Sequence, residues 1–223
     1  MPKVVERADA IICNSENTRR DLVEHYRVDP GRTHVTHLGV DPPRVDDRGT
    51  FAHLRPYMMA LSNTRMKNAA LTIREFASYK EAHGGDLRLV VVGRDIEGQA
   101  RDRPDVEVLG HMDRDRLVEL MSGAEALLFP SHYEGFGFPP LEAMSLGVPT
   151  VVSDRGSLPE VVGDASLVVD IDRRGSLAGA IHQLRTDEGL VAELRSRGDA
   201  RWRMFTWEDC ARRTLQVYRG LLG

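Results

Sequence analysis

The stretch "EGFGFPPLE", residues 134–142, places two carboxylates on either side of two glycines and a pair of prolines. Proline is favoured in the first turn of a helix and excluded from its interior, so a helix is expected to begin near Pro139. Glu142 then falls in the first turn, and Glu134 falls in the loop before it. The free N–H groups and positive dipole end of such a helix favour an anion such as phosphate.

The residues around this helix start add a second kind of ligand chemistry. Gly135 and Gly137 carry no Cβ, so the backbone can approach a ligand closely. Carboxylates bind sugar hydroxyls well, whereas a diphosphate needs amide N–H groups and cations, and a nucleotide sugar offers both partners. The glutamates alone also allow a plainer interpretation, in which Glu142 complements the helix dipole and Glu134 is a solvated loop residue.

A second candidate loop, "SNTRMKN" at residues 62–68, contains Arg65 and Lys67. It directly follows an apolar stretch of strand length and directly precedes a helical one. Cations at a strand end can meet a diphosphate and stabilise the charge on a departing nucleotide. Taken by itself, the loop could equally be an ordinary solvated basic loop.

The elements that must position these loops alternate along the chain. Amphipathic segments with apolar residues three and four apart lie at residues 68–84, 114–124 and 139–147, between or beside the apolar strands. Strands are expected at residues 57–62, 87–93, 105–109, 125–129, 149–153 and 166–170. This alternation predicts an α/β fold, a Rossmann-like parallel sheet with helices on both faces, in which ligands bind where strands end and helices begin.

The two ends of the chain have a different pattern. Residues 8–15 and 32–39 are expected to be strands, and residues 16–26 a helix with Ser15 as its N-cap. The turn-rich, acidic residues 40–49 indicate a linker. From Arg173 onward the chain is mostly helical, and its last helix is expected to open with Thr206 as N-cap and to close on Gly223.

Composition excludes several classes of function. The formal net charge of -4 argues against a nucleic-acid binder with a basic face. Cys13 and Cys210 lie at opposite ends of the chain without metal-ligand spacing, which indicates free thiols in a reducing cytoplasm. No stretch approaches the roughly 20 apolar residues of a membrane span, so any membrane contact is expected to be peripheral.

The histidines and the glycine pattern argue against two further functions. His34 and His37 are three apart on an expected strand, so they face opposite sides and make a poor metal pair. His132 precedes the first candidate loop, where a structural or solvent-facing role is the favoured interpretation. No G-x-G-x-x-G follows the first strand of a βαβ unit, which disfavours a nicotinamide dehydrogenase.

The motif "EGFGFPPLE" resembles the E-x7-E motif, with its internal GFG, of the retaining family 4 glycosyltransferases of GT-B fold. The surrounding stretch from "ALLFPSHY" to "SLVVD" is similar to that family almost throughout. The resemblance covers essentially the whole chain. It implies that residues 1–41 are a remnant of an N-terminal domain with the interdomain linker, residues 42–205 a donor-binding domain, and residues 206–223 a helix crossing back between domains. The N-terminal domain is then nearly absent.

The resemblance also implies roles for the residues of the glutamate motif. Glu134 would contact the hydroxyls of the donor sugar and act as a catalytic residue. The backbone of Gly135, Phe136 and Gly137 would line the sugar and phosphate. Glu142 would hold the ribose hydroxyls.

Further roles follow from the same resemblance. The Leu141 amide would lie near phosphate, and Lys67 would bind the diphosphate and offset the charge of the leaving group. His111, in the loop at residues 110–113, would lie near the base. The family usually has a basic residue where this chain has Met66, and Arg65 would substitute for it from one position earlier.

By this resemblance the chain is expected to be the donor-binding half of a retaining glycosyltransferase that transfers a hexose from a GDP-, UDP- or ADP-linked donor, without a metal or other cofactor. Its expected partners are an N-terminal domain or a second copy of the chain, with no nucleic acid and no transmembrane segment. Alone, it should bind donor weakly and transfer slowly or not at all. The alternative is a non-catalytic nucleotide-sugar-binding module or a truncated fragment.

Overall fold

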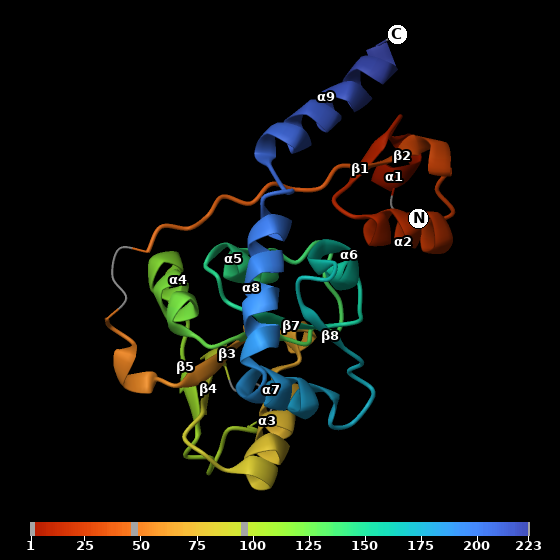
Figure 1. Ribbon diagram of the computed structural model, residues 1–223. Helices are drawn as coiled ribbons and strands as arrows, with labels where there is room; N and C mark the ends of the chain where they lie inside the picture. Colours follow the sequence, from red (N-terminus) through yellow and green to blue (C-terminus); the bar gives the residue numbers. More distant parts are fainter. Residues whose placement is uncertain (1–2, 46–48, 95–97, 223) are drawn as a thin grey trace.

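A computed structural model describes residues 3–45, 49–94 and 98–222 and is built around a six-stranded parallel sheet (Figure 1). The strands are β3 (Tyr57–Ser62), β4 (Arg88–Gly93), β5 (Val106–Leu109), β6 (Leu127–Phe129), β7 (Thr150–Ser153) and β8 (Leu167–Val169). Each lies within one of the six stretches expected from the sequence or overlaps it closely. The expected fold class is therefore confirmed.

The order of the strands across the sheet, β5-β4-β3-β6-β7-β8, reverses beside β3. The chain first adds β4 and β5 on one side of β3 and then returns to place β6 on the other side. Met59 and Ala60 of β3 pair with Leu127 and Leu128 of β6 in parallel register. In doubly wound sheets the crevice at such a reversal, outside the carboxyl ends of the strands, is where ligands bind. The loops after β3 and β6 both lie there.

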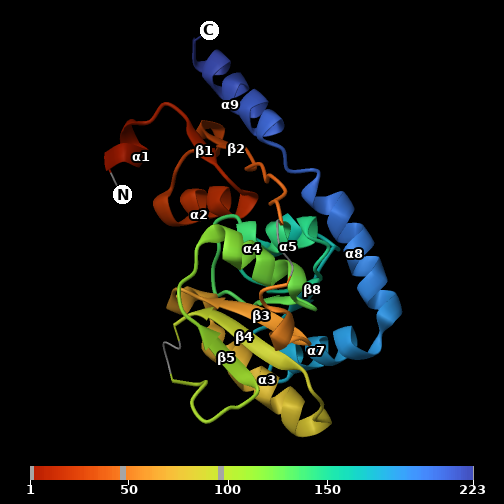
Figure 2. The same ribbon diagram turned by 90° about the vertical axis from the view of Figure 1, so that its left-hand side faces the viewer.

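Helices cover both faces of this sheet because successive side chains of each strand point to opposite sides. Met58 and Ala60 belong to one apolar core and Met59 to the other. The helices α4 (Arg114–Gly123), α5 (Phe138–Ser145) and α6 (Leu158–Val162) cover the Met59 face, and α3 (Ala69–His83) and α7 (Ser176–Thr186) cover the opposite one (Figure 2).

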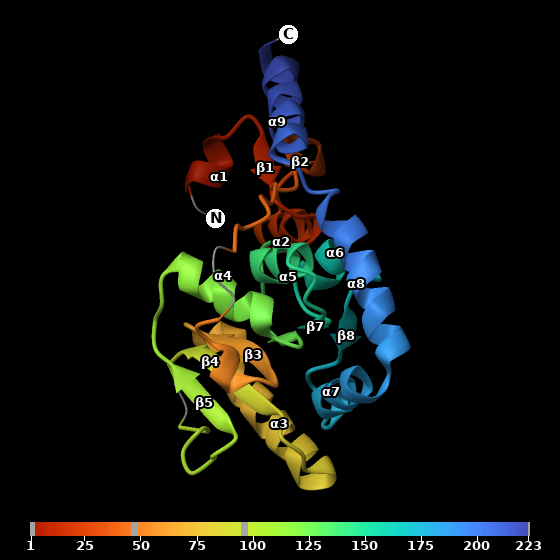
Figure 3. The same ribbon diagram turned by 60° about the vertical axis from the view of Figure 1, so that its left-hand side comes forward.

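The C-terminal part consists of α8 (Glu188–Trp202) and α9 (Trp207–Leu222). As Figure 3 shows, α8 runs along the side of the domain from α7 toward α9. Its buried Gly198 lies against Met144 of α5, where a Cβ would stand 3.2 Å from the Met144 side chain. By contrast, α9 has no buried residue and projects away from the sheet.

An N-terminal segment, residues 3–38, forms a small unit beside the sheet. It contains α1 (Lys3–Arg7), β1 (Ile11–Cys13), α2 (Glu16–Tyr26), a 3-10 turn η1 (Pro30–Arg32) and β2 (Thr33–Val35). The two strands pair in parallel and are shorter than the expected stretches 8–15 and 32–39, because their register covers only three residues of each. Ser15 is the N-cap of α2, as expected, since its side chain accepts a hydrogen bond from the Thr18 N–H.

Two chain connections cross where the N-terminal segment meets the rest of the molecule. The Val40 N–H donates to the carbonyl of Phe205 at 2.9 Å. A Cβ on Gly39 would lie 2.2 Å from the backbone nitrogen of Trp207, so the crossing requires glycine there. Thr206 accepts a hydrogen bond from the Asp209 N–H and caps α9 as expected.

Three features complete the description of the fold. A 3-10 turn, η2 (Ala52–Leu54), precedes β3. Residues 46–48 of the expected linker and Gly223, the expected helix end, lie outside the described residues. Among the helices that the structure describes, none is long and apolar enough to cross a bilayer.

Candidate functional site

The two loops singled out in the sequence meet at the reversal point of the sheet. The loop after β3 contains a 3-10 turn, η3 (Arg65–Lys67), and the loop after β6 runs over residues 130–137. The N–H of His132 donates to the carbonyl of Met66 at 2.8 Å and so ties the loops together through their backbones. The His132 side chain is exposed, which agrees with the favoured solvent-facing interpretation.

Lys67 and Glu134, the two residues expected to be catalytic, form an ion pair. Lys67 Nζ lies 2.8 Å from Glu134 Oε1, and their side chains are only 14% and 16% exposed. The ammonium group also lies 4.4 Å from the centre of the Phe129 ring, at the end of β6. A cation and a carboxylate are thus fixed side by side, one able to bind a phosphate oxygen and the other a hydroxyl group.

The backbone of Glu134 is held by the turn before α6. The Ser157 N–H donates to the Glu134 carbonyl at 3.1 Å, and the Ser157 hydroxyl lies 2.9 Å and 2.8 Å from the carbonyl oxygens of Glu134 and Phe136. Gly156 has φ +57, and a Cβ there would lie 2.8 Å from the Glu134 oxygen. This close approach requires glycine, because both its space and its dihedral angle exclude other residues.

The start of α5 differs from the expectation in one detail. Gly137, with φ +107, precedes the helix, which begins at Phe138, one residue before the expected start near Pro139. Glu142 is therefore the fifth helical residue and lies just beyond the first turn, so the expected first-turn position was wrong. Because Pro139 and Pro140 have no N–H, Phe138 is the residue of that turn whose amide has no acceptor within the helix.

Glu142 has a partner of its own, away from Lys67. Arg114 Nη2, at the start of α4, lies 2.7 Å from Glu142 Oε1, and these side chains are 65% and 14% exposed, respectively. Both residues line a cavity of about 350 Å³ together with Gly39, Val40, Asp41, Phe138 and Trp207. The two glutamates of the motif thus belong to two neighbouring sites, where Glu134 is paired with Lys67 and Glu142 with Arg114.

Of the other residues expected at the site, Phe136 and Leu141 are buried in the core, whereas Arg65 and His111 are exposed. Arg65 and Met66 lie in η3, and neither side chain is buried. His111 is exposed in the loop between β5 and α4, three residues before Arg114. Arg65 therefore shares the loop of Lys67, and His111 lies in the loop before the helix whose Arg114 lines the Glu142 cavity.

Sequence reasoning missed a set of polar residues in the N-terminal segment. The Thr18 hydroxyl lies 3.0 Å from Asn14 Oδ1 and 3.4 Å from the Gly135 carbonyl oxygen. The hydroxyl of Tyr133 donates to Asp21 at 2.6 Å. The contacts with Gly135 and Tyr133 join residues more than a hundred positions apart, and no local spacing in the sequence signals them.

The expectation for the two N-terminal histidines was partly wrong. His34 lies in β2, but His37 lies beyond the strand end at Val35, so the two residues do not share a strand. His37 Nε2 lies 2.7 Å from Glu160 Oε1 of α6. Within the described part of the chain, no group of three or more His, Cys, Asp or Glu side chains could hold a metal ion.

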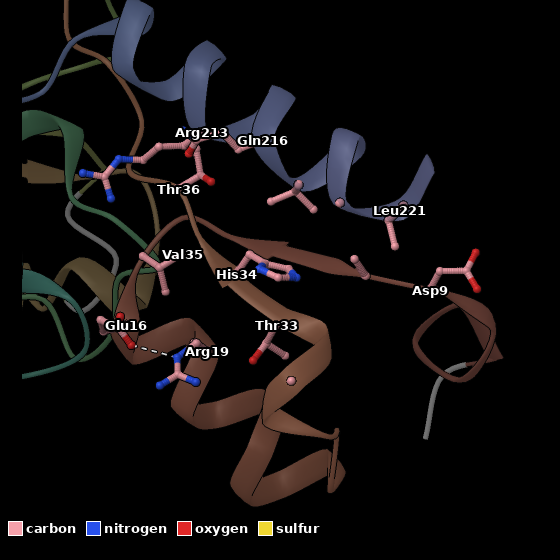
Figure 4. Close-up of a pocket in the computed structure, with 14 residues that line it drawn as sticks. Asp9, Glu16, Arg19, Thr33, His34, Val35, Thr36, Arg213, Gln216 and Leu221 are labelled. Carbon is pink, nitrogen blue, oxygen red and sulfur yellow. Dashed lines mark hydrogen bonds and ion pairs between the residues drawn. The ribbon is translucent and has the colours of Figure 1, made fainter. Parts of the chain in front are cut away.

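The largest cavity among those described lies away from this site. It measures about 620 Å³ and is enclosed by β2, α2 and α9 (Figure 4). His34 lines it, as do Thr36, Arg213 and the Arg19–Glu16 ion pair of 2.9 Å. Because none of the residues of the two candidate loops lines it, we do not assign it to the candidate site.

Comparisons with known proteins agree with this geometry. Residues 57–201 match the family model described as Glycosyl transferases group 1, and residues 1–44 match the model described as Glycosyltransferase Family 4. O-antigen chain mannosyltransferase B from Escherichia coli is 34% identical over 186 residues, which are 83% of this chain and 45% of that protein. The chain spans about half the length of the curated relatives it matches.

Solved structures share the fold. Sucrose-phosphate synthase from Thermosynechococcus elongatus has a TM-score of 0.80 and 25% identity, covering 99% of this chain and 60% of that one. HepE from Anabaena, solved in complex with UDP-glucose, has a TM-score of 0.81 and 19% identity, covering 98% of this chain and 65% of that one.

Proposed function

The chain belongs to the family Glycosyl transferases group 1, and we propose that it is the donor-binding half of a retaining glycosyltransferase that uses a nucleoside diphosphate hexose. The observation that carries this proposal is the Lys67–Glu134 ion pair, 2.8 Å long, at the reversal point of the sheet. A cation for the diphosphate and a carboxylate for the sugar are adjacent there, as the two ends of one donor require.

The donor extends across the two places that the glutamates define. The diphosphate meets Lys67, the exposed Arg65 and the amides of Phe138 and Leu141 at the start of α5, and the hexose hydroxyls meet Glu134. The ribose hydroxyls meet Glu142, and the base extends toward the loop of His111. The solved structure of HepE with UDP-glucose supports a nucleotide sugar as the class of ligand, without deciding between UDP, GDP and ADP.

The transfer step uses the positive charge of this chain. The bond between the anomeric carbon of the hexose and the β-phosphate oxygen breaks, and a bond forms from that carbon to a hydroxyl oxygen of the acceptor, which releases its proton. The nucleoside diphosphate leaves with the bonding electron pair. Lys67 and the helix amides stabilise the charge that develops on it. Retention requires the acceptor oxygen to arrive on the face from which the phosphate departs.

The acceptor is expected to come from outside the described site. Residues 42–205 would form the donor-binding domain, and residues 1–41 with 206–223 would connect it to an N-terminal domain that supplies acceptor contacts. The cavity of Figure 4 and the exposed α9 lie beside the N-terminal segment, where such a domain would be joined. A second copy of the chain is the other candidate to supply these acceptor contacts.

The test is a thermal-shift and calorimetric titration against UDP, GDP, ADP, their hexose conjugates and NAD. We expect one nucleoside diphosphate and its conjugate to stabilise the protein by binding the native state. Glu142→Ala should abolish this stabilisation, and Glu193→Ala, at an exposed ion pair of α8, should leave it unchanged. Stabilisation by NAD alone would contradict the proposal.

A second candidate function is a nucleotide-sugar-binding module without transfer activity, because the Lys67–Glu134 pair could bind a donor without transferring its sugar. The two functions differ in turnover. Hexose transfer by this chain, alone or mixed with an N-terminal domain of a group 1 relative, would support the enzyme. Donor binding without transfer in either arrangement would support the module.

A further inference from the structure

Glu160 of α6 binds the start of a helix far away in the sequence. Its Oε1 accepts the N–H of Glu16 at 2.8 Å, and its Oε2 accepts the N–H of Asn17 at 3.1 Å. These are two of the first N–H groups of α2, which have no partner inside the helix. The Ser15 hydroxyl accepts a third, from Thr18, at 3.0 Å. A carboxylate from the sheet domain therefore anchors the N-terminal segment.

The same carboxylate holds His37, whose ring contacts the first candidate loop. His37 Nε2 lies 2.7 Å from Glu160 Oε1. The His37 ring lies 6.3 Å from the ring of Phe136 and 5.6 Å, edge to face, from that of Phe205. Phe136 and Phe205 are themselves 5.6 Å apart, and both are buried. Glu160, His37 and Phe136 thus form a continuous chain of contacts from the anchor to the loop.

The surroundings of the Glu160 carboxylate favour its ionised form. Burial alone raises the pKa of Glu160, but the hydrogen bonds from His37 and from the N–H groups of Glu16 and Asn17 outweigh it and hold that pKa below its ordinary value. The positive end of the α2 dipole acts in the same direction. The carboxylate is therefore charged at neutral pH.

The next turn of α2 contacts the loop directly. Asp21 accepts the hydroxyl of Tyr133, and the Thr18 hydroxyl lies 3.4 Å from the carbonyl oxygen of Gly135. With His37 on Phe136, three of the four residues from 133 to 136 have a partner in the N-terminal segment. Glu134 lies in the middle of this run, and its side chain forms the ion pair with Lys67.

We propose that Glu160 and His37 are positioning residues for the donor-sugar loop, residues 133–136, because they fix the N-terminal segment that braces it. This inference rests on the proposed function, which gives the loop its ligand. The Glu142 side chain is paired with Arg114 and takes no part in these contacts, although Phe138, which lines its cavity, packs against Phe136. We therefore expect Glu160 and His37 to affect the hexose half of the donor more than the nucleoside half.

Three variants separate the contributions of Glu160 and His37 to holding the loop at residues 133–136. Glu160→Gln keeps the shape of the side chain and removes its charge and one acceptor. His37→Ala removes the ring and the hydrogen bond, whereas His37→Phe keeps the ring contacts with Phe136 and Phe205. Glu193→Gln makes the same chemical change as Glu160→Gln at the exposed Glu193–Arg197 pair of α8 and is the matched control.

The first readout is amide hydrogen exchange of the protein without ligand. Glu160→Gln and His37→Ala should accelerate exchange at the start of α2 and in residues 133–136, by about tenfold, while β3 and β4 keep their protection. His37→Phe should retain more loop protection than His37→Ala. Unchanged exchange in residues 133–136 in both Glu160→Gln and His37→Ala would overturn the proposal. Equal acceleration throughout the sheet would overturn it as well, since that is global destabilisation.

The second readout is the calorimetric affinity for UDP, GDP and ADP beside UDP-glucose, GDP-mannose and ADP-glucose. For the pair that the wild type binds, Glu160→Gln should weaken the hexose conjugate by about tenfold, the order that one hydrogen bond contributes, and the free diphosphate by less than about twofold. Equal weakening of both would contradict a role in positioning. If the wild type binds none of them, the proposed function fails, and hydrogen exchange still decides the brace.

Discussion

The carboxylate of Glu134 and the ammonium group of Lys67 lie 2.8 Å apart across the reversal point of the sheet. They come from loops that follow neighbouring strands, and each side chain is largely shielded from water. The loss of one partner leaves the other as a poorly solvated charge, which destabilises more than loss of the pair. The pair also holds both groups in place before a donor arrives, and a diphosphate and a sugar hydroxyl can then replace the mutual contact.

The coupling between these two residues can be measured. Lys67→Met and Glu134→Gln should each lower the free energy of unfolding, and the double variant should lose less than the sum by about 1 kcal/mol, because the partly exposed pair is discounted for solvent screening. Urea denaturation of the four proteins gives this number. Strict additivity would mean that the ion pair contributes nothing to stability.

The two glutamates of the motif should differ in which part of the donor they affect. Glu142→Ala should weaken binding of the free nucleoside diphosphate and of its hexose conjugate by the same factor, roughly tenfold or more. Glu134→Ala should weaken only the conjugate, because the free diphosphate has no hexose. Titration calorimetry with both ligands provides the comparison, and the reverse pattern would exchange the two assignments.

The sequence predicted the sheet well for identifiable reasons. The stretch at residues 57–62 is apolar up to its last residue, Ser62, and coincides with β3, because a central strand is buried on both faces. The glutamate motif placed α5 within one residue, since prolines mark a first turn. The one-residue difference, which moves Glu142 beyond the first turn, depends on the positive φ of Gly137, which no sequence pattern reports.

The turn under Glu134 should be sensitive to a single methyl group. Gly156→Ala should lower the free energy of unfolding by about 2 kcal/mol or more, because it combines an unfavourable φ with a Cβ 2.8 Å from the Glu134 oxygen. Gly175→Ala is the matched control: its φ is +82 and its ψ -4, but a Cβ there meets nothing within 4 Å. It should lose only about 1 kcal/mol. Equal urea midpoints for the two variants would contradict the steric argument.

The anchor at Glu160 should add a pH dependence to stability. Its pKa is lowered in the folded protein from 4.5, its ordinary value, so the contribution is present above that value and is lost as the pH falls through the lower folded pKa. Thermal unfolding of the wild type and Glu160→Gln should therefore differ at neutral pH and converge in acid. A difference that stays constant down to acid pH would remove the carboxylate as its source.

A buried tyrosine should give the opposite dependence in alkali. Burial raises the pKa of Tyr57 from 10.0 to about 12, and its hydroxyl donates to the Leu120 carbonyl at 2.5 Å. Because the folded pKa is raised, the stabilisation is present below pH 10 and is lost as the pH rises toward 12. The stability of the wild type should fall more steeply over that range than that of Tyr57→Phe. Urea midpoints of the two proteins across that range provide the test.

The contacts between the N-terminal segment and the loop could not be predicted. Glu160 and His37 are 123 positions apart, and their meeting depends on how two units of the chain pack, which local periodicity does not contain. The assignment of His37 to a strand failed for the same reason, since the three-residue pairing of β1 and β2 ends before it. The Glu160–His37 contact and the position of His37 beyond the strand both depend on tertiary contacts.

The crossing at Gly39 and Trp207 sets the mechanics of the molecule. Two covalent connections pass through one point, where the backbone bond from Val40 to Phe205 joins them. The N-terminal segment and the last helix are therefore joined to the sheet domain at one shared place. A change in the position of the N-terminal segment would reach the loop at residues 133–136 through the contacts of Thr18, Asp21 and His37.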